Sequence, residues 1–192
     1  MNWFPFLSYV LVSTFTPGPN NISSMSNAGR YGFGASLRYR LGIFCGFFAV
    51  QLLAALCSAT LLDYIPAAQP YMLALGAAYI LWMAWKTLTS RSGGEETSAA
   101  DNAFLSGVLL QLVNVKVIIF AVTTMSTFVL PHTRSVPALA LFALGLAGTA
   151  FVSVNCWGAF GAVFSRALRR HERAANAVMA LLLVYCALSL YL

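Results

Sequence analysis

The stretch Thr14–Asn21, TFTPGPNN, interrupts the first hydrophobic segment of the chain with two prolines, a glycine and two asparagines. The residues before it, from Asn2 to Ser13, are almost all apolar or aromatic, and no charged side chain occurs before Arg30. A proline removes a helix hydrogen bond and clashes with the preceding turn, so two prolines around a glycine predict a break in a helix. The meaning of this break depends on the surroundings of the segment.

The composition indicates a membrane protein. Of the 192 residues, 60% are hydrophobic and only 8% are charged, and the mean hydropathy is +0.79. Soluble domains carry roughly 25% charged residues, so we expect the lipid bilayer to surround most of this chain. The net charge of +6 does not indicate nucleic acid as a partner, because the basic residues form no patch with interleaved aromatic side chains.

Six segments are apolar over the roughly 20 residues that a helix needs to cross a bilayer. Backbone exposed to lipid must satisfy its own hydrogen bonds, so the expected fold class is all-α, an integral membrane protein with six transmembrane helices and a broken first helix. The segments run Trp3–Ser26, Leu41–Leu62, Tyr64–Trp85, Phe104–Leu130, Pro137–Phe164 and Ala174–Leu192.

The basic residues of the connections predict the orientation in the membrane. Three alternate connections carry nine of them, and the other two connections carry only Arg134. Because basic loops stay in the cytoplasm, both termini are expected on the opposite side of the membrane. The nine residues are Arg30, Arg38, Arg40, Lys86, Arg91, Arg166, Arg169, Arg170 and Arg173.

The chain is expected to form one transmembrane domain, 1–192, made of two halves. A linker rich in Gly, Ser and acidic residues, 90–103, separates the first half, 1–89, from the second, 104–192. Three spans per half is an odd number, so the halves would enter the membrane in opposite senses, as in transporters built from inverted repeats. Tyr79 and Tyr185 match when the third and sixth spans are aligned, which is weak support for such a repeat.

Lys116 is the most unusual residue inside a span. At 1.5 Å per residue it lies about 18 Å along the helix from Phe104 and about 21 Å from Leu130, near the middle of the membrane. A lysine there costs roughly 2.5–3.5 kcal/mol. Snorkelling, or a structural role with carbonyl partners, would be the plain explanation. No Asp or Glu lies within a span to neutralise the charge, so its partner is carbonyl groups, water or an anionic group such as an amino-acid carboxylate.

Other polar residues of the first, fourth and fifth spans join Lys116 in a predicted substrate-binding or translocation site. Irregular backbone at membrane depth is tolerated where protein buries it or where it lines a wet cavity, and transporters use such breaks to bind substrates. The alternative is a packed proline kink with asparagines bonding across a helix interface. The predicted site residues are Pro17, Gly18, Pro19, Asn20, Asn21, Gln111, Asn114, Lys116 and Asn155.

Catalysis, metal binding and cofactors are not expected. The four cysteines lie inside spans, without a C-x-x-C motif or a nearby His at ligand spacing, and are interpreted as small buried hydrophobic residues. Lys116 with Ser106 or Ser126 is a poor catalytic dyad because each serine is ten residues away along one helix. Gly42 and Gly46 in the second span are interpreted as a packing motif.

At these residues the chain resembles the LysE/RhtB family of amino-acid exporters. Typical of the family are a Pro-Gly-Pro motif in the first span, here Pro17-Gly18-Pro19, and an Asn-x-Lys element in the fourth, here Asn114-Val115-Lys116. The similarity extends over nearly the whole chain. It implies six helices in the bacterial inner membrane and efflux of small neutral amino acids and derivatives, such as cysteine and O-acetylserine, driven by the proton gradient.

Two departures from the family pattern matter. Many members have Asn-Pro-Lys where Val115 stands here, so a weaker second break is expected. Some relatives that export lysine carry an acidic residue in the second span, where Gln51 is the only strongly polar side chain of this sequence; its presence argues against cationic substrates and leaves the proton carrier unassigned. The alternatives are a threonine and homoserine exporter of the same family, or a passive small-solute channel without dependence on a proton gradient.

Overall fold

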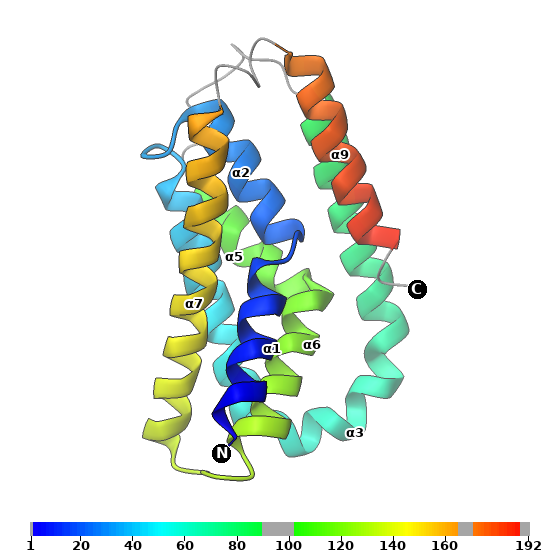
Figure 1. Cartoon of the computed structure of the whole chain (residues 1–192). Helices are drawn as coiled ribbons and strands as arrows, with labels where there is room; N and C mark the ends of the chain where they lie inside the picture. Colours follow the sequence, from blue (N-terminus) through cyan, green and yellow to red (C-terminus); the bar gives the residue numbers. More distant parts are fainter. Residues whose placement is uncertain (1, 90–101, 165–170, 189–192) are drawn as a thin grey trace.

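The structure, a computed structural model, describes residues 2–89, 102–164 and 171–188. Every regular element within these ranges is helical, as the sequence predicts (Figure 1). The elements are α1 (Trp3–Phe15), α2 (Pro19–Tyr31), α3 (Leu37–Thr89), α5 (Ala103–Val113), α6 (Val115–Thr123), the π-helix η1 (Thr124–Val129), α7 (Val136–Val163) and α9 (Glu172–Leu188). Most of the predicted linker, 90–103, lies outside the described residues; α5 begins at its last residue.

Both predicted breaks are present, and the second is sharper than expected. The first segment is divided at Thr16–Gly18 into α1 and α2, and α2 continues beyond Ser26 to Tyr31. The fourth segment is divided at Asn114, where α5 and Val115–Val129 meet at a bend of 62°. The second break is therefore present with a valine in the place of a proline, and it coincides with Asn114, whose side-chain contacts are described below.

The second and third predicted spans are joined in one helix. Hydrogen-bonded helix continues through the expected connection between Leu62 and Tyr64, a junction that contains no glycine to favour a helix end. In Figure 1, α3 runs down beside α5 and α7, turns at the lower end of the molecule and rises beside α9. The expected separate helices are thus two legs of α3.

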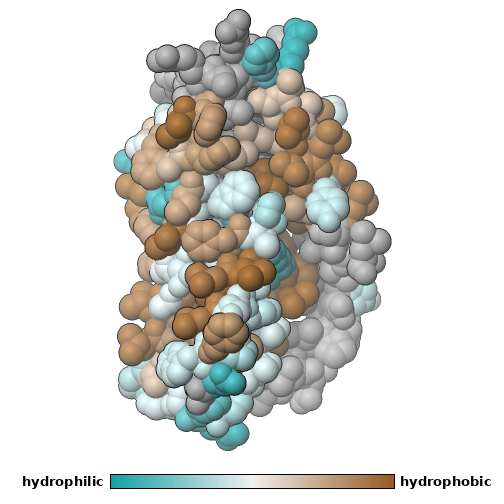
Figure 2. Space-filling model, in the orientation of Figure 1, coloured by the Kyte–Doolittle hydropathy of each residue, from teal (hydrophilic) through white to brown (hydrophobic). Residues whose placement is uncertain are grey.

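The exposed surface fits a bilayer. Among the described helices, Leu37–Cys57 and Val136–Val163 are each long and apolar enough to cross a membrane, and α5 with Val115–Val129 would be a third, broken span. Large apolar side chains such as Phe4, which is 81% exposed, cover the outside. Figure 2 shows apolar surface over the middle of this face and hydrophilic surface towards its two ends. Such a surface is unfavourable in water and favourable in lipid.

Glycines bring the helices around the breaks into close contact. A Cβ atom on Gly42 would lie 2.0 Å from the carbonyl oxygen of Phe104, and one on Gly107 would lie 2.3 Å from that of Tyr39. The packing role predicted for Gly42 and Gly46 is therefore confirmed, with α5 as the partner helix. On the other side, Gly161 of α7 meets the backbone of Met25 in α2, which brings α7 against the first break.

One basic residue assigned to a loop is buried. Arg38 and Arg40 lie in the first turn of α3, and Arg40 has no exposed surface. Its guanidinium lies 3.8 Å from the centre of the Phe33 ring and donates a hydrogen bond to the Phe33 carbonyl. Arg40 packs against Gly158 of α7, where a Cβ atom would lie 2.5 Å from Nη1. Arg40 therefore closes this end of the helix packing instead of lying in solvent.

Candidate functional site

The first break is a short extended crossing between two helices. Helix α1 ends at Phe15, and Thr16 has φ −62° and ψ 146°. Gly18 is fully extended, and Pro19 begins α2. A proline in the first helical turn loses no hydrogen bond, because the amides of that turn have no partner within the helix. The motif Pro17-Gly18-Pro19 thus ends one helix and starts the next.

Side chains from α2 and α7 satisfy the carbonyl groups that the break sets free. Asn21 Nδ2 donates to the carbonyl of Thr14 at 2.8 Å and to that of Thr16 at 2.9 Å. Ser153 Oγ donates to the Thr14 carbonyl at 2.8 Å, and Trp157 Nε1 donates to the Phe15 carbonyl at 3.2 Å. Because buried carbonyl groups need partners, these donors hold the break open and in place. The carbonyls themselves are occupied.

Lys116 connects the second break with the first. It is the second residue of α6, and its Nζ lies 3.0 Å from Thr16 Oγ1 and 3.5 Å from the Thr16 carbonyl oxygen. A Cβ atom on Gly18 would lie 3.1 Å from the same Nζ, so the glycine leaves room for the ammonium group. Of the three kinds of partner expected for Lys116, which were carbonyl groups, water or an anionic group, the structure shows a carbonyl group, and it adds a hydroxyl group. Both groups are uncharged, which leaves the positive charge available to an anion.

A network of amide side chains lies behind the lysine. Asn20 and Gln111 form a reciprocal pair, with Asn20 Nδ2 donating to Gln111 Oε1 at 2.8 Å and Gln111 Nε2 donating to Asn20 Oδ1 at 3.0 Å. Asn114 Nδ2 donates to the same Asn20 Oδ1 at 3.1 Å. The network ties the residue at the second break to α2, and this explains why the fourth segment bends there without a proline.

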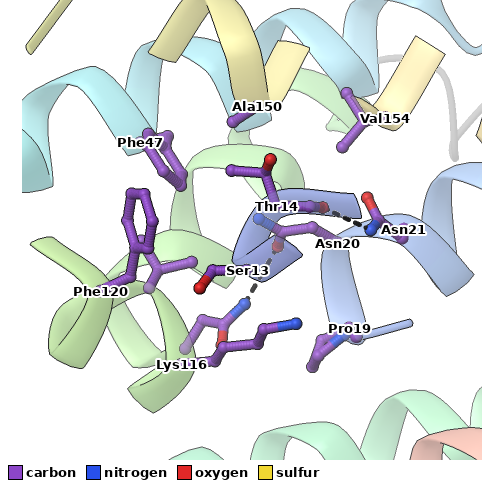
Figure 3. A pocket seen from close by; sticks show the side chains of 13 residues that line it. Ser13, Thr14, Pro19, Asn20, Asn21, Phe47, Lys116, Phe120, Ala150 and Val154 are labelled. Atoms are coloured by element: carbon purple, nitrogen blue, oxygen red, sulfur yellow. Dashed lines mark hydrogen bonds between the residues drawn. The ribbon is translucent and has the colours of Figure 1, made fainter. Parts of the chain in front are cut away.

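A small cavity lies between the two breaks (Figure 3). The volume open to the centres of water molecules is about 40 Å³, and one water needs roughly 10–15 Å³ of it, so the cavity has room for a few waters. Figure 3 shows Asn20, Asn21 and Lys116 on one side and the rings of Phe47 and Phe120 on another. Polar groups on one wall and apolar groups on another are typical of a small-molecule site.

The structure brings together most of the predicted site residues. Asn155 is placed elsewhere: its amide donates to the Phe151 carbonyl of its own helix at 2.7 Å. Pro17 is exposed beside the break, and Gln111 is buried behind Asn20, both outside the lining. The predicted residues that line the cavity are Gly18, Pro19, Asn20, Asn21, Asn114 and Lys116.

Sequence reasoning missed two kinds of contributor. The apolar wall includes Phe47 and Phe120. Nothing in the sequence marked these residues as part of a site, because apolar residues are common in every span. The one usable indication was the spacing of Phe120, four residues after Lys116, which places both on the same helix face. Trp157 was also missed, although an indole N–H inside a span needs an acceptor. In the described ranges there is no group of three His, Cys, Asp or Glu side chains that could hold a metal ion.

The chain is similar to known proteins over nearly its whole length. Residues 11–192 match the model of the LysE type translocator family. Proteins named cysteine/O-acetylserine efflux protein from Escherichia coli (strain K12) and Shigella sonnei (strain Ss046) are 41% identical over 186 residues, which cover 97% of this chain and 95% of each relative. The protein of the same name from Escherichia coli O139:H28 is 40% identical over the same length. No solved structure shows a significant match.

Proposed function

The chain belongs to the LysE type translocator family, and we propose that it exports small neutral amino acids, with cysteine and O-acetylserine as its substrates. The observation that carries this proposal is Lys116, an ammonium group at a helix break, which lines a cavity and whose hydrogen-bond partners among the described residues are uncharged. The similar proteins are named as efflux proteins, which agrees with the expectation that the chain is a transporter and not an enzyme.

The chemistry of the cavity supports a substrate with one carboxylate and a short uncharged side chain. Lys116 supplies the positive charge, and a charge-assisted hydrogen bond to a carboxylate is stronger than one to a neutral group. No carboxylate is among the lining residues that the structure describes, so a lysine or arginine substrate would find no partner for its side chain among them. The apolar wall around Phe47 and Val154 suits the thiol of cysteine or the acetyl group of O-acetylserine.

The proposal includes six spans in the bacterial inner membrane. The spans would be α1 with α2, the two legs of α3, α5 with α6 and η1, α7, and α9. In Figure 1 the connection between α2 and α3, the end of α7 and the start of α9 lie at the upper end, and the N-terminus lies at the opposite end. This arrangement supports basic connections on one side of the membrane and the N-terminus on the other. We propose that the basic side is the cytoplasm and that both termini are periplasmic; an alkaline phosphatase fusion after Leu192 that stayed inactive would contradict this orientation.

Transport in inside-out membrane vesicles tests the substrate and the energy source together. Uptake of labelled cysteine and O-acetylserine should exceed that of threonine, and lysine should not accumulate. An imposed pH gradient should increase uptake, since we propose that proton movement drives export. Flux that is equal with and without the gradient would favour a passive channel, and preferential uptake of threonine and homoserine would assign the substrate differently. Lysine uptake without cysteine uptake would contradict the proposal.

A further inference from the structure

We propose that Asn114 Oδ1 accepts a hydrogen bond from the α-ammonium group of the substrate, and that Gln111 and Asn20 are positioning residues that hold the Asn114 amide in that orientation. This inference rests on the proposed export function and names the second group by which the substrate is recognised. Together with Lys116, it makes the cavity a site for the zwitterion of an α-amino acid.

The orientation of the Asn114 amide follows from a chain of hydrogen bonds that begins at the backbone. The carbonyl of Gly107 can only accept, and it lies 3.1 Å from Gln111 Nε2, so the Gln111 amide is fixed. Gln111 Oε1 then faces Asn20 Nδ2 at 2.8 Å, which turns Asn20 Oδ1 towards Asn114. Asn114 Nδ2 donates to this oxygen. The remaining polar atom, Asn114 Oδ1, must be an acceptor.

Asn114 Oδ1 has no hydrogen-bond partner in the described part of the chain. Asn114 is only 1% exposed and lines the cavity. The oxygen itself is buried, and buried acceptors without donors are uncommon and unfavourable. Because the residue lines the cavity, we infer that a group bound in the cavity reaches this oxygen and donates to it. The position of Asn114 in the chain makes the absence of a hydrogen bond to its Oδ1 more unusual. Asn114 precedes the first residue of α6, where an asparagine oxygen ordinarily caps the helix, yet its side chain makes no capping bond.

The cavity is therefore lined by one residue that can bind an anion and by one that needs a hydrogen-bond donor. Lys116 offers an ammonium group whose partners are neutral, and Asn114 offers an acceptor that lacks a donor. The carboxylate and the α-ammonium group of an amino acid supply the two complementary groups. A carboxylic acid without the amine would satisfy Lys116 alone, and an amine without the carboxylate would satisfy Asn114 alone. The proposal thus predicts discrimination that neither residue provides by itself.

Competition by substrate analogues tests this discrimination. In inside-out vesicles, labelled cysteine is competed with unlabelled cysteine or with 3-mercaptopropionate, which keeps the thiol and the carboxylate and lacks the amine. The wild-type protein should prefer cysteine. Asn114→Leu should weaken competition by cysteine roughly tenfold and leave competition by 3-mercaptopropionate unchanged, so the preference falls. Gln111→Leu should lower the preference for cysteine less than Asn114→Leu does. In this variant the Asn114 amide is still present, but it is no longer held in one orientation.

Asn155→Leu is the matched control. It removes a second asparagine from inside the membrane, one that bonds to its own helix and lies outside the cavity, and the preference for cysteine should stay at the wild-type value. An Asn114→Leu protein with wild-type preference would overturn the proposal, as would one that loses both ligands equally. If this variant does not reach the membrane, the preference of Gln111→Leu decides in the same way. Wild-type vesicles that take up no cysteine would refute the export function itself.

Discussion

The two helix breaks of this protein arise in different ways. At the first, Thr16–Gly18, two prolines and an extended glycine end α1 and begin α2. The residues at this break are therefore sufficient to interrupt the helix. At the second, Asn114 has neither proline nor glycine beside it, and the helices on its two sides nevertheless meet at 62°. Its side chain is held by Asn20, in the first turn of α2 directly after the first break. The second break is therefore a product of tertiary contact.

The breaks also differ in what they leave open. Every carbonyl from Thr14 to Thr16 has a side-chain donor, so the backbone acceptors at the first break are satisfied by the protein itself. At the second break, Asn114 Oδ1 has no partner among the described residues, and Lys116 follows in the first turn of α6. We propose that the first break supplies the shape of the cavity and that the second supplies the groups that bind. Variants of the two breaks should separate these roles.

The largest effect is expected from Lys116, which joins the two breaks. Lys116→Met removes the ammonium group and its bond to Thr16, and export should fall by about 10- to 100-fold, since hydrogen bonds to charged groups contribute roughly 1.5–3 kcal/mol. Lys116→Arg should also fail, because a planar fork cannot replace a compact ammonium beside Gly18. Efflux is measured against membrane abundance. Full activity of Lys116→Met at normal abundance would remove the charge from the mechanism.

The sequence was sufficient for the features that depend on local chemistry. Apolar length predicted helices, the Pro17-Gly18-Pro19 motif predicted the first break, and the cost of a charge in lipid selected Lys116. It was insufficient where a distant residue decides. The bend at Asn114 depends on an amide 94 positions away in the chain, and the donor to the Phe15 carbonyl is Trp157, 142 positions away. Neither hydrophobic periodicity nor helix propensity reveals these two contacts. The sequence therefore predicted candidate site residues but not the contacts between them.

An intermediate effect is expected when the first break is repaired. Pro17→Ala with Pro19→Ala restores two backbone N–H groups and relieves the clash with the preceding turn, so α1 and α2 can join. In a continuous helix the restored N–H groups of residues 17 and 19 would bond to the carbonyls of Ser13 and Phe15. The second of these bonds would compete with Trp157 for the Phe15 carbonyl, and the cavity would narrow. Because proline costs roughly 3 kcal/mol in a helix interior, the straightened form becomes accessible, and we expect export to fall by about tenfold without loss of protein.

Pro137→Ala is the control for the proline variant. Pro137 lies in the first turn of α7, where a proline costs no hydrogen bond, and it is far from the residues that line the cavity. Export and abundance should both stay at wild-type values. If the double variant at Pro17 and Pro19 also transports normally, the Pro-Gly-Pro break is a packing kink, and the cavity takes its shape from other residues.

The smallest effect is expected from the donors that complete the first break. Ser153→Ala removes one of two hydrogen bonds to the Thr14 carbonyl and leaves the other, from Asn21, in place. A typical hydrogen bond contributes about 1 kcal/mol, and the surviving donor keeps the carbonyl from becoming unsatisfied. Thermal unfolding in detergent should therefore shift slightly, and export should stay within about twofold of the wild type, less than the tenfold that 1.4 kcal/mol would produce.

Trp157→Phe sharpens this last comparison because the Phe15 carbonyl has one side-chain donor where the Thr14 carbonyl has two. The phenyl ring keeps most of the packing and removes the N–H, so the carbonyl must turn to another donor. The hydrogen bond from Trp157 is exposed, and its removal should again lower the free energy of unfolding by about 1 kcal/mol. Thr149→Val, which removes a hydroxyl bonded within α7, controls for the loss of polarity. A Trp157→Phe protein as impaired as Lys116→Met would mean that the first break also takes part in binding, contrary to the division of roles between the two breaks.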